Sequence, residues 1–362
     1  MNPTLAAIPG SLIRALNAQK RPGDIDLGLG EPLLRPDVAW FEAATEWVRE
    51  FGCPYSANAG MLELRTKLAT HFAYPGLDRP ENVCVTVGSQ EALYLAIKAL
   101  CDPATDEVLI VSPCYPAYPK LCQLEGVAHR EVLLDPERGF EPDADRVLAA
   151  IGPQTRLVLL ASPANPTGRV WPRAELEKLA AGLGEVAVLV DEVYRELDYS
   201  DQAPFSIATV HPHTFVANSL SKSHALTGLR LGWLMGPAEP MQAVVKAHQF
   251  VNTAASTFSQ RVALAALDAP SHRAHYMAQR ARLLQLLDAA GLAYVAPDGA
   301  FYCMLRIGGD SVKAAFALLE QERVVTIPGV AFGAEGWLRI SWVAPEEALA
   351  EGIGRIARFL QC

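Results

Sequence analysis

A lysine that ends an apolar run is the first residue of this chain to suggest chemistry. In ANSLSKSHALTGLRLGW (217–233), Lys222 stands between two serines and precedes a segment too apolar to be a solvated face. Lysine is rarely buried without a partner or a function. A partly desolvated amine can be unprotonated near neutral pH and form a Schiff base with a carbonyl compound. A surface lysine in a serine-rich loop is the alternative interpretation.

Other polar residues follow runs that are predicted to be buried strands. From about residue 83 to residue 236, short β-branched runs alternate with helical patterns, which predicts a mostly parallel sheet covered by helices. The predicted strands cover residues 83–87, 107–111, 156–160, 186–190, 215–219 and 231–235. In open α/β sheets, ligands bind outside the carboxyl ends of the strands. The candidate residues that follow these strands are Gly88, Ser89, Gln90, Tyr115, Asn165, Asp191, Tyr194 and Lys222.

The C-terminal part of the chain has a different pattern. A long amphipathic helix is predicted from about residue 271 to Gly291, and short apolar runs then alternate with helices. This alternation is typical of a smaller α+β unit. We therefore predict a large domain over residues 41–272 and a small domain made of residues 1–40 and 273–362.

Charge and composition favour small-molecule ligands. The chain has 31 basic and 40 acidic residues, a net charge of −9 and no basic block, which argues against nucleic acid or an anionic membrane as a partner. No window is long and apolar enough to span a bilayer. Pro9, Gly10 and Arg14 interrupt the start, where a signal peptide needs a continuous apolar core. Seven cysteines without CxxC spacing favour free thiols, and we expect a cytoplasmic protein.

No metal site is expected. The histidines of HPH (211–213) and HRAH (272–275) lack a companion set of ligands and are interpreted as surface residues. Each candidate at the strand ends also has a structural explanation when taken alone. Gly88 and Ser89 could cap a helix, Asn165 could stabilise a turn, and the tyrosines could be core aromatics with a solvated hydroxyl.

Taken together, a lysine, an acid and an anion site point to pyridoxal phosphate. This cofactor needs a lysine on its aldehyde carbon, an acid that keeps its pyridine nitrogen protonated, and a site for its phosphate. Lys222 and Asp191 could supply the first two. The backbone N–H groups of residues 88–90, where a helix is predicted to begin, could bind the phosphate. Further phosphate donors could be Ser219, Ser221 and Arg230.

Short motifs in a fixed order extend over nearly the whole chain. They are LGLGEP (27–32), YSANAGMLELR (55–65), TVGSQEAL (86–93), SPCYPAY (112–118), SPANPTG (162–168), DEVY (191–194), SLSKSHALTGLRLGW (219–233), PDGAFY (297–302), PGVAFG (328–333) and LRISW (338–342). In these motifs the chain resembles the fold-type I pyridoxal-phosphate enzymes of the class I/II aminotransferase group, which includes aspartate aminotransferase. The resemblance implies an α/β fold with a mostly parallel seven-stranded sheet in the large domain and a smaller α+β domain.

The resemblance also implies catalytic roles. Lys222 is expected to form the Schiff base (aldimine) with the cofactor and then to move the substrate's α-proton. Asp191 is expected to pair with the pyridine nitrogen, while Tyr194 and Asn165 donate hydrogen bonds to the phenolic oxygen. Tyr115 is expected to stack on the ring. Tyr55 is expected to reach the cofactor's phosphate from a second subunit, which implies a homodimer.

The remaining expected roles concern the phosphate and the substrate. Arg339 is expected to bind the α-carboxylate of the amino acid as a planar fork, close to the backbone of Gly30 and to Asn165. The residues expected around the phosphate are Gly88, Ser89, Gln90, Ser219, Ser221 and Arg230.

The expected activity is transfer of an amino group between an L-amino acid and a 2-oxo acid by a ping-pong mechanism. Carbon–sulfur β-lyases, decarboxylases and acyl transferases on the same scaffold are the open alternatives. A non-catalytic regulatory domain is disfavoured because no helix-turn-helix pattern precedes LGLGEP. A nicotinamide-dependent dehydrogenase is disfavoured because no GxGxxG follows a strand.

Overall fold

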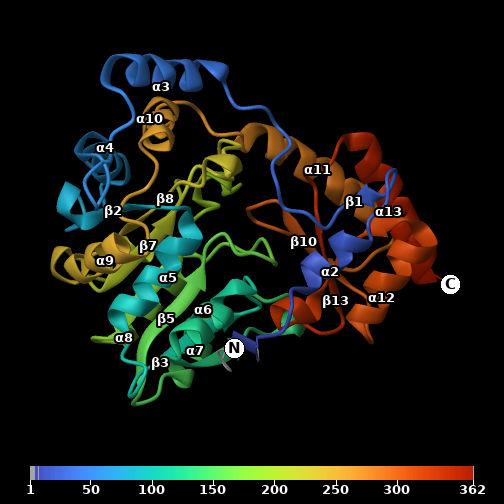
Figure 1. The fold of residues 1–362 in the computed structure, drawn as a ribbon. Coiled ribbons are helices and arrows are strands. Elements are labelled where there is room, and N and C mark those ends of the chain that lie inside the picture. The colour runs from blue at the N-terminus through green and yellow to red at the C-terminus, as the bar shows by residue number, and fades with distance from the viewer. Residues whose placement is uncertain (1–4, 7, 362) are drawn as a thin grey trace.

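The computed structural model describes residues 5–6 and 8–361 of the chain (Figure 1). Residues 1–4, 7 and 362, which belong to the predicted small domain, lie outside the described residues. The largest sheet has seven strands in the order β2-β8-β7-β6-β5-β3-β4. Their bounds are β2 Val83–Thr86, β3 Glu107–Ser112, β4 Ala128–Leu133, β5 Thr155–Ala161, β6 Ala187–Asp191, β7 Thr214–Asn218 and β8 Gly232–Met235.

The strand pairing confirms the predicted mostly parallel seven-stranded sheet. Strands β4, β3, β5, β6 and β7 pair in parallel, and β8 runs antiparallel to both of its neighbours, β7 and β2. Every predicted run appears as one of these strands, within a residue or two of its predicted bounds. The strand that the apolar pattern missed is β4, which pairs only with β3 and exposes most of its side chains. An edge strand of this kind does not produce a continuous apolar run.

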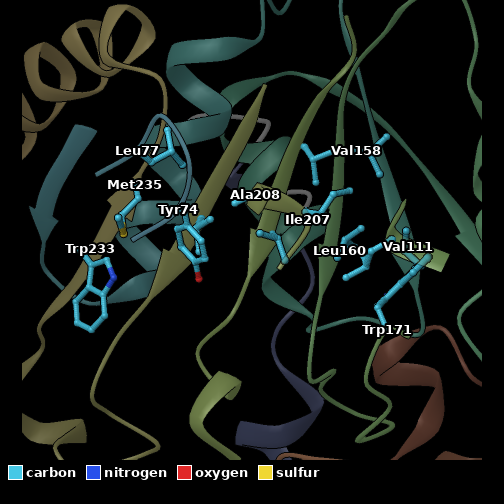
Figure 2. Close-up of a cluster of buried hydrophobic side chains, with 14 of the residues drawn as sticks. Tyr74, Leu77, Val111, Val158, Leu160, Trp171, Ile207, Ala208, Trp233 and Met235 are labelled. Carbon is cyan, nitrogen blue, oxygen red and sulfur yellow. The ribbon is translucent and has the colours of Figure 1, made fainter. Parts of the chain in front are cut away.

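Side chains of the central strands alternate between two apolar layers. Val158 and Leu160 of β5 pack on one face of the sheet with Trp171, and Leu159 packs on the other face with Leu189 of β6. Figure 2 shows part of the first layer, in which Leu160 lies beside Val111 and Trp171. Because both faces are covered, these strands are apolar at nearly every position, as strands buried on both faces must be.

Helices precede and follow these strands. Helix α5 begins directly after β2 and lies against β7, β8 and α9, and α3 packs on α10. Asp37, Asp143 and Ser256 cap α3, α7 and α10 by accepting backbone hydrogen bonds. The bounds are α2 Leu12–Gln19, α3 Val38–Phe51, α4 Leu62–Phe72, α5 Ser89–Leu100, α6 Ala117–Glu125, α7 Ala144–Ala150, α8 Arg173–Leu183, α9 Ala238–Val251, α10 Thr257–Ala266, α11 Arg273–Ala289, α12 Ser311–Ala317 and α13 Glu346–Gln361.

Two small sheets hold the C-terminal part together with an N-terminal segment. One has the order β12-β13-β10-β9, and the other joins β1 to β11 in parallel, with Ile25 beside Val324. The backbone N–H of Ser341 donates to the carbonyl of Leu27 (2.7 Å). This pairing places residues 27–31 next to β13. The bounds are β1 Ile25–Asp26, β9 Tyr294–Val295, β10 Tyr302–Arg306, β11 Val324–Val325, β12 Ile327–Pro328 and β13 Trp337–Ser341.

One histidine interpretation is wrong. His211 was expected at the surface, but it is only 4% exposed and its Nε2 atom is 2.9 Å from the carbonyl oxygen of Val186. In the described part of the chain, no group of three or more His, Cys, Asp or Glu residues is arranged to hold a metal ion. None of the helices described is both long and apolar enough to cross a bilayer.

The packing of β6 generates a stability prediction. Leu189→Ala should lower the free energy of unfolding by about 2–5 kcal/mol, because it leaves a cavity in a fully buried layer. Leu124→Ala, at a site that is 46% exposed on α6, is the matched control and should change stability little. Chemical unfolding of both variants measures the difference, and equal losses would contradict the packing described for β6.

Candidate active site

A cavity of about 330 Å³ lies where the carboxyl ends of the central strands face the smaller sheet. Most of the residues singled out from the sequence line it. They are Gly30, Ser89, Gln90, Tyr115, Asn165, Asp191, Tyr194, Ser219, Ser221, Lys222, Arg230 and Arg339. Two of the candidates are not part of this lining: Gly88, which directly precedes Ser89, and Tyr55, which is 87% exposed.

Lys222 is half-buried after the end of β7. Its Nζ atom donates to the carbonyl oxygen of Gly30 (2.9 Å) and lies 6.0 Å from the ring centroid of Phe301. The preceding turn is fixed by the hydroxyl oxygen of Ser219, which accepts from the backbone N–H of Ser221 (3.2 Å). The amine therefore contacts a backbone carbonyl and faces an aromatic ring, and residues from the N-terminal and C-terminal parts of the chain define its position.

Asp191 ends β6 and is 6% exposed. Its Oδ2 atom accepts from the hydroxyl of Tyr118 (2.7 Å), and its Oδ1 atom accepts from the backbone N–H of Val193 (3.2 Å). Burial raises the pKa of Asp191 to about 6, although these two hydrogen bonds act in the opposite direction. A cation beside this carboxylate would lower its pKa again and be stabilised by it.

The N-terminus of α5 forms a cradle with room for an anion. Gly88 has φ +80°, and a Cβ atom there would lie 2.7 Å from Nη2 of Arg230. A Cβ atom on Gly232 would lie 2.4 Å from the backbone nitrogen of Ser89. The glycines thus allow the Arg230 guanidinium and the free N–H groups of the first helical turn to approach one another. Unpaired N–H groups together with an arginine favour a bound phosphate.

Arg339 is 3% exposed on β13. It donates to Oδ1 of Asn165 through Nη1 (3.1 Å) and to the carbonyl of Gly28 through Nη2. Its guanidinium carbon lies 4.3 Å from the ring centroid of Tyr302 and 4.8 Å from that of Phe332. Among residues 5–6 and 8–361, no carboxylate is within salt-bridge distance of Arg339, and its Nε atom has no hydrogen-bond partner. Burial lowers the pKa of Arg339.

Tyrosines 118 and 302 are site residues that the sequence did not single out. The hydroxyl of Tyr302 is 2.9 Å from that of Tyr194, and a Cβ atom on Gly30 would lie only 1.8 Å from it. Gly30 is therefore required where the N-terminal segment passes Tyr302. Burial raises the pKa of Tyr194, so its hydroxyl stays protonated. Both missed tyrosines lie in motifs noted above, SPCYPAY and PDGAFY, but nothing in those motifs shows that their hydroxyls point at the cavity.

Comparison with known proteins identifies the family. The family model for aminotransferase class I and II matches residues 22–356. This chain is a class I and II aminotransferase. It is 36% identical to the aspartate/prephenate aminotransferase of Thermus thermophilus over 96% of this chain and 94% of that protein. It is 33% identical to an aspartate aminotransferase of Pyrococcus horikoshii over 98% of this chain and 95% of that protein.

Solved structures agree. A double mutant of Thermus thermophilus aspartate aminotransferase superposes with a TM-score of 0.93 at 36% identity, covering 99% of each chain. An aspartate aminotransferase of Thermotoga maritima superposes with a TM-score of 0.93 at 30% identity, covering 100% of each chain. The expected fold-type I architecture, pyridoxal 5′-phosphate as the cofactor, and amino transfer between an amino acid and a 2-oxo acid are therefore confirmed.

The residues of the aminotransferase fit this cofactor. The cavity offers a half-buried amine at Lys222, a buried acid at Asp191 and a glycine-lined anion cradle at the start of α5. These are the three groups that pyridoxal phosphate requires: a covalent anchor, a partner for the ring nitrogen and a phosphate site.

The burial of Asp191 generates a pH-dependent prediction for the cofactor-free enzyme. Because its pKa is raised, the folded state holds the proton more tightly than the unfolded state, and the buried charge lowers stability as the pH rises from about 4 through about 6. Asp191→Asn should therefore stabilise the cofactor-free protein at pH 8 by on the order of 2–3 kcal/mol, with a smaller gain at pH 5.

Urea unfolding of the cofactor-free proteins at the two pH values measures this gain. Asp201→Asn, at an exposed position, is the control and should show no such pH dependence. A gain from Asp191→Asn that is equal at pH 5 and pH 8 would show that the Asp191 carboxyl group is not perturbed by burial.

Proposed function

We propose that Lys222 attaches the cofactor and carries the proton that amino transfer must move. When bound, pyridoxal phosphate supplies a carbonyl carbon that accepts the amino group and a ring that withdraws electrons from the α-carbon. The Nζ atom of Lys222 is held by the carbonyl of Gly30, so an amine released from the cofactor would have a fixed place beside the substrate. A proton taken from the α-carbon can then be returned by the same amine.

Asp191 is the proposed partner of the pyridine nitrogen. Its carboxylate is oriented by Tyr118 and by the backbone of Val193, and burial strengthens its interaction with any cation. Tyr194 and Asn165 are the proposed donors to the phenolic oxygen, and Tyr115 the proposed stacking residue. The proposed phosphate-binding residues are Gly88, Ser89, Gln90, Ser219, Ser221 and Arg230.

The α-carboxylate shared by both reactants is the proposed ligand of Arg339. The observation that carries this assignment is a buried guanidinium that has no carboxylate partner in the described residues and an Nε atom without an acceptor. A buried cation of this kind is destabilised until an anion reaches it. Gly30 lines the same cavity as Arg339. Because an amino acid and a 2-oxo acid would use this one anchor in turn, the proposed kinetic mechanism is ping-pong.

Replacing the planar guanidinium group of Arg339 with an amine of the same charge tests this assignment. Arg339→Lys should lower kcat/KM by about 100-fold, and by a similar factor for every amino acid, because lysine cannot make the planar pair of hydrogen bonds. Arg306→Lys is the matched control, since Arg306 forms an exposed pair with Glu137. Steady-state assays over a panel of amino acids and 2-oxo acids provide the measurement. A loss confined to one substrate would assign Arg339 to the side chain and not to the α-carboxylate.

The same assays separate amino transfer from the lyase and decarboxylase chemistry of related scaffolds. Amino transfer consumes one 2-oxo acid for each 2-oxo acid formed, whereas a carbon–sulfur lyase needs no acceptor. The relatives described above carry aminotransferase names, which supports transfer.

A homodimer is the proposed assembly. Tyr55 is 87% exposed, and Phe250 on α9 is 81% exposed. Asn58 links the two segments by donating to the carbonyl of Thr253 (2.8 Å). Large exposed aromatics on segments that contact one another favour a protein interface. A second copy covering this surface would bring Tyr55 to the phosphate cradle of its partner, which is the role that the sequence resemblance implies.

Mixed dimers test this role. Tyr55→Ala and Lys222→Ala homodimers should both have low activity, but a heterodimer of the two variants contains one site with Lys222 and an intact Tyr55. Such a heterodimer should regain about half of the wild-type activity, as expected for a two-fold dimer with shared sites. Differently tagged chains allow its purification. Activity no higher than that of the homodimers would place Tyr55 outside the partner's site.

We also propose a large domain over residues 41–272 and a small domain made of residues 1–40 and 273–362. Support comes from the apolar clusters, since the core around β10, β13 and α13 includes Leu16, Ile25 and Leu27 from the N-terminal segment. A cytoplasmic location is proposed as well. It is supported by the free thiols of the described cysteines, which are Cys53, Cys84, Cys101, Cys114, Cys122 and Cys303.

A further inference from the structure

A series of hydrogen bonds and close contacts joins the start of α5 to the exposed segment that carries Tyr55. Glu91 stands in the first turn of α5 with a side chain that is 8% exposed. Its Oε2 atom accepts from the backbone N–H of Val87, directly before Gly88, and its Oε1 atom accepts from Nδ2 of Asn252. One carboxylate therefore ties the turn before the phosphate cradle to the C-terminal end of α9.

The end of α9 is tied in turn to the segment around Asn58. Asn58 donates through Nδ2 to the carbonyl of Thr253 (2.8 Å), and its own carbonyl lies 2.7 Å from Nδ1 of His248. Because a carbonyl can only accept, this Nδ1 atom carries a proton. The other ring nitrogen of His248, which is fully buried, lies 3.6 Å from Oε2 of Glu91, beyond hydrogen-bond distance, so the two side chains are neighbours without a direct hydrogen bond. We call Val87, Glu91, Asn58, His248, Asn252 and Thr253 the Glu91 network.

We propose that Glu91 and Asn252 are positioning residues that couple pyridoxal phosphate binding to dimer formation. The proposal rests on the proposed phosphate site and on the proposed homodimer. A phosphate bound at the start of α5 orders one side of the Glu91 network, and a second copy bound over Tyr55 and Phe250 orders the other side. Cofactor binding then makes the free energy of dimer formation more favourable, and dimer formation makes the free energy of cofactor binding more favourable by the same amount, because such linkage is reciprocal.

The two hydrogen bonds of Glu91 allow a sharp test. Both of its oxygens accept, so Glu91→Gln must turn its NH2 group toward one of the two donors. Asn252→Asp instead sets a carboxylate against the carboxylate of Glu91. The double variant exchanges donor and acceptor between the two positions and keeps the net charge, so it can form the link again. Neither residue lines the cavity.

Each single variant should bind pyridoxal phosphate about tenfold more weakly, as expected for the loss of a hydrogen bond to a charged group. Each should also lose part of the tightening of the dimer that the cofactor produces in the wild type, while the part that comes from the proposed contact of Tyr55 with the phosphate remains. The double variant should return to within about twofold of the wild type in both measurements. Equilibrium titration of the visible spectrum gives the cofactor affinity, and sedimentation equilibrium with and without cofactor gives the dimer affinity.

Two controls isolate the coupling. Glu239→Gln, at an exposed position in the first turn of α9, removes a charge without touching the Glu91 network and should leave both affinities unchanged. Pyridoxal, which lacks the phosphate, should bind Glu91→Gln and the wild type equally, since the proposed coupling passes through the phosphate site.

Single variants that match the wild type, or losses that simply add in the double variant, would overturn the coupling and leave the proposed function intact. A wild-type protein that binds no pyridoxal phosphate, or that stays monomeric with it, would overturn the proposed function and the coupling together.

Discussion

The burial of ionisable groups without charge partners is the constraint on which this structure depends. Asp191 and Glu192 are neighbours in the chain and both are buried, but their surroundings differ. Glu192 pairs with Arg195 (3.3 Å) and accepts a hydrogen bond from Tyr74, so its charge is balanced within the fold. Asp191 and Arg339 form no salt bridge in the described part of the chain. Unpaired buried charges are costly, and a fold retains them where a ligand completes them.

The scaffold holds these groups with neutral hydrogen bonds and aromatic faces. Arg339 lies between the rings of Tyr302 and Phe332 and donates to an amide and a carbonyl oxygen. Asp191 accepts from a phenol and a backbone N–H. Such contacts orient a charged group without neutralising it, so most of its electrostatic interaction stays available to a ligand. A nearby opposite charge would fix the geometry equally well but would compete with cofactor and substrate.

Glycines provide the space that this arrangement needs. At Gly30 a methyl group would overlap the hydroxyl of Tyr302, and at Gly232 it would overlap the backbone of Ser89. Both glycines lie where segments from distant parts of the chain meet at the cavity. The backbone at Gly30 therefore packs directly against a side chain, and the backbone at Gly232 packs directly against another stretch of backbone. Only a residue without a Cβ atom permits such close packing.

Patterns in the sequence were enough to predict the mostly parallel sheet, the edge of the sheet at which the cavity lies, and most of the residues that line the cavity. Strands buried on both faces must be apolar, so they can be recognised in the sequence. Polar residues that follow such parallel strands converge at one edge of the sheet. This pattern was sufficient to predict that Asp191, Asn165 and Lys222 lie together. The edge strand β4 was not predicted because most of its side chains are exposed and form no apolar run. The burial of His211 was not predicted because a single histidine carries no periodic pattern that would indicate its exposure. The orientation of the Tyr118 and Tyr302 hydroxyls toward the site, and the absence of a salt bridge to Arg339 among the described residues, follow from the three-dimensional structure alone. Those properties depend on distances between segments far apart in the chain, which no local pattern specifies.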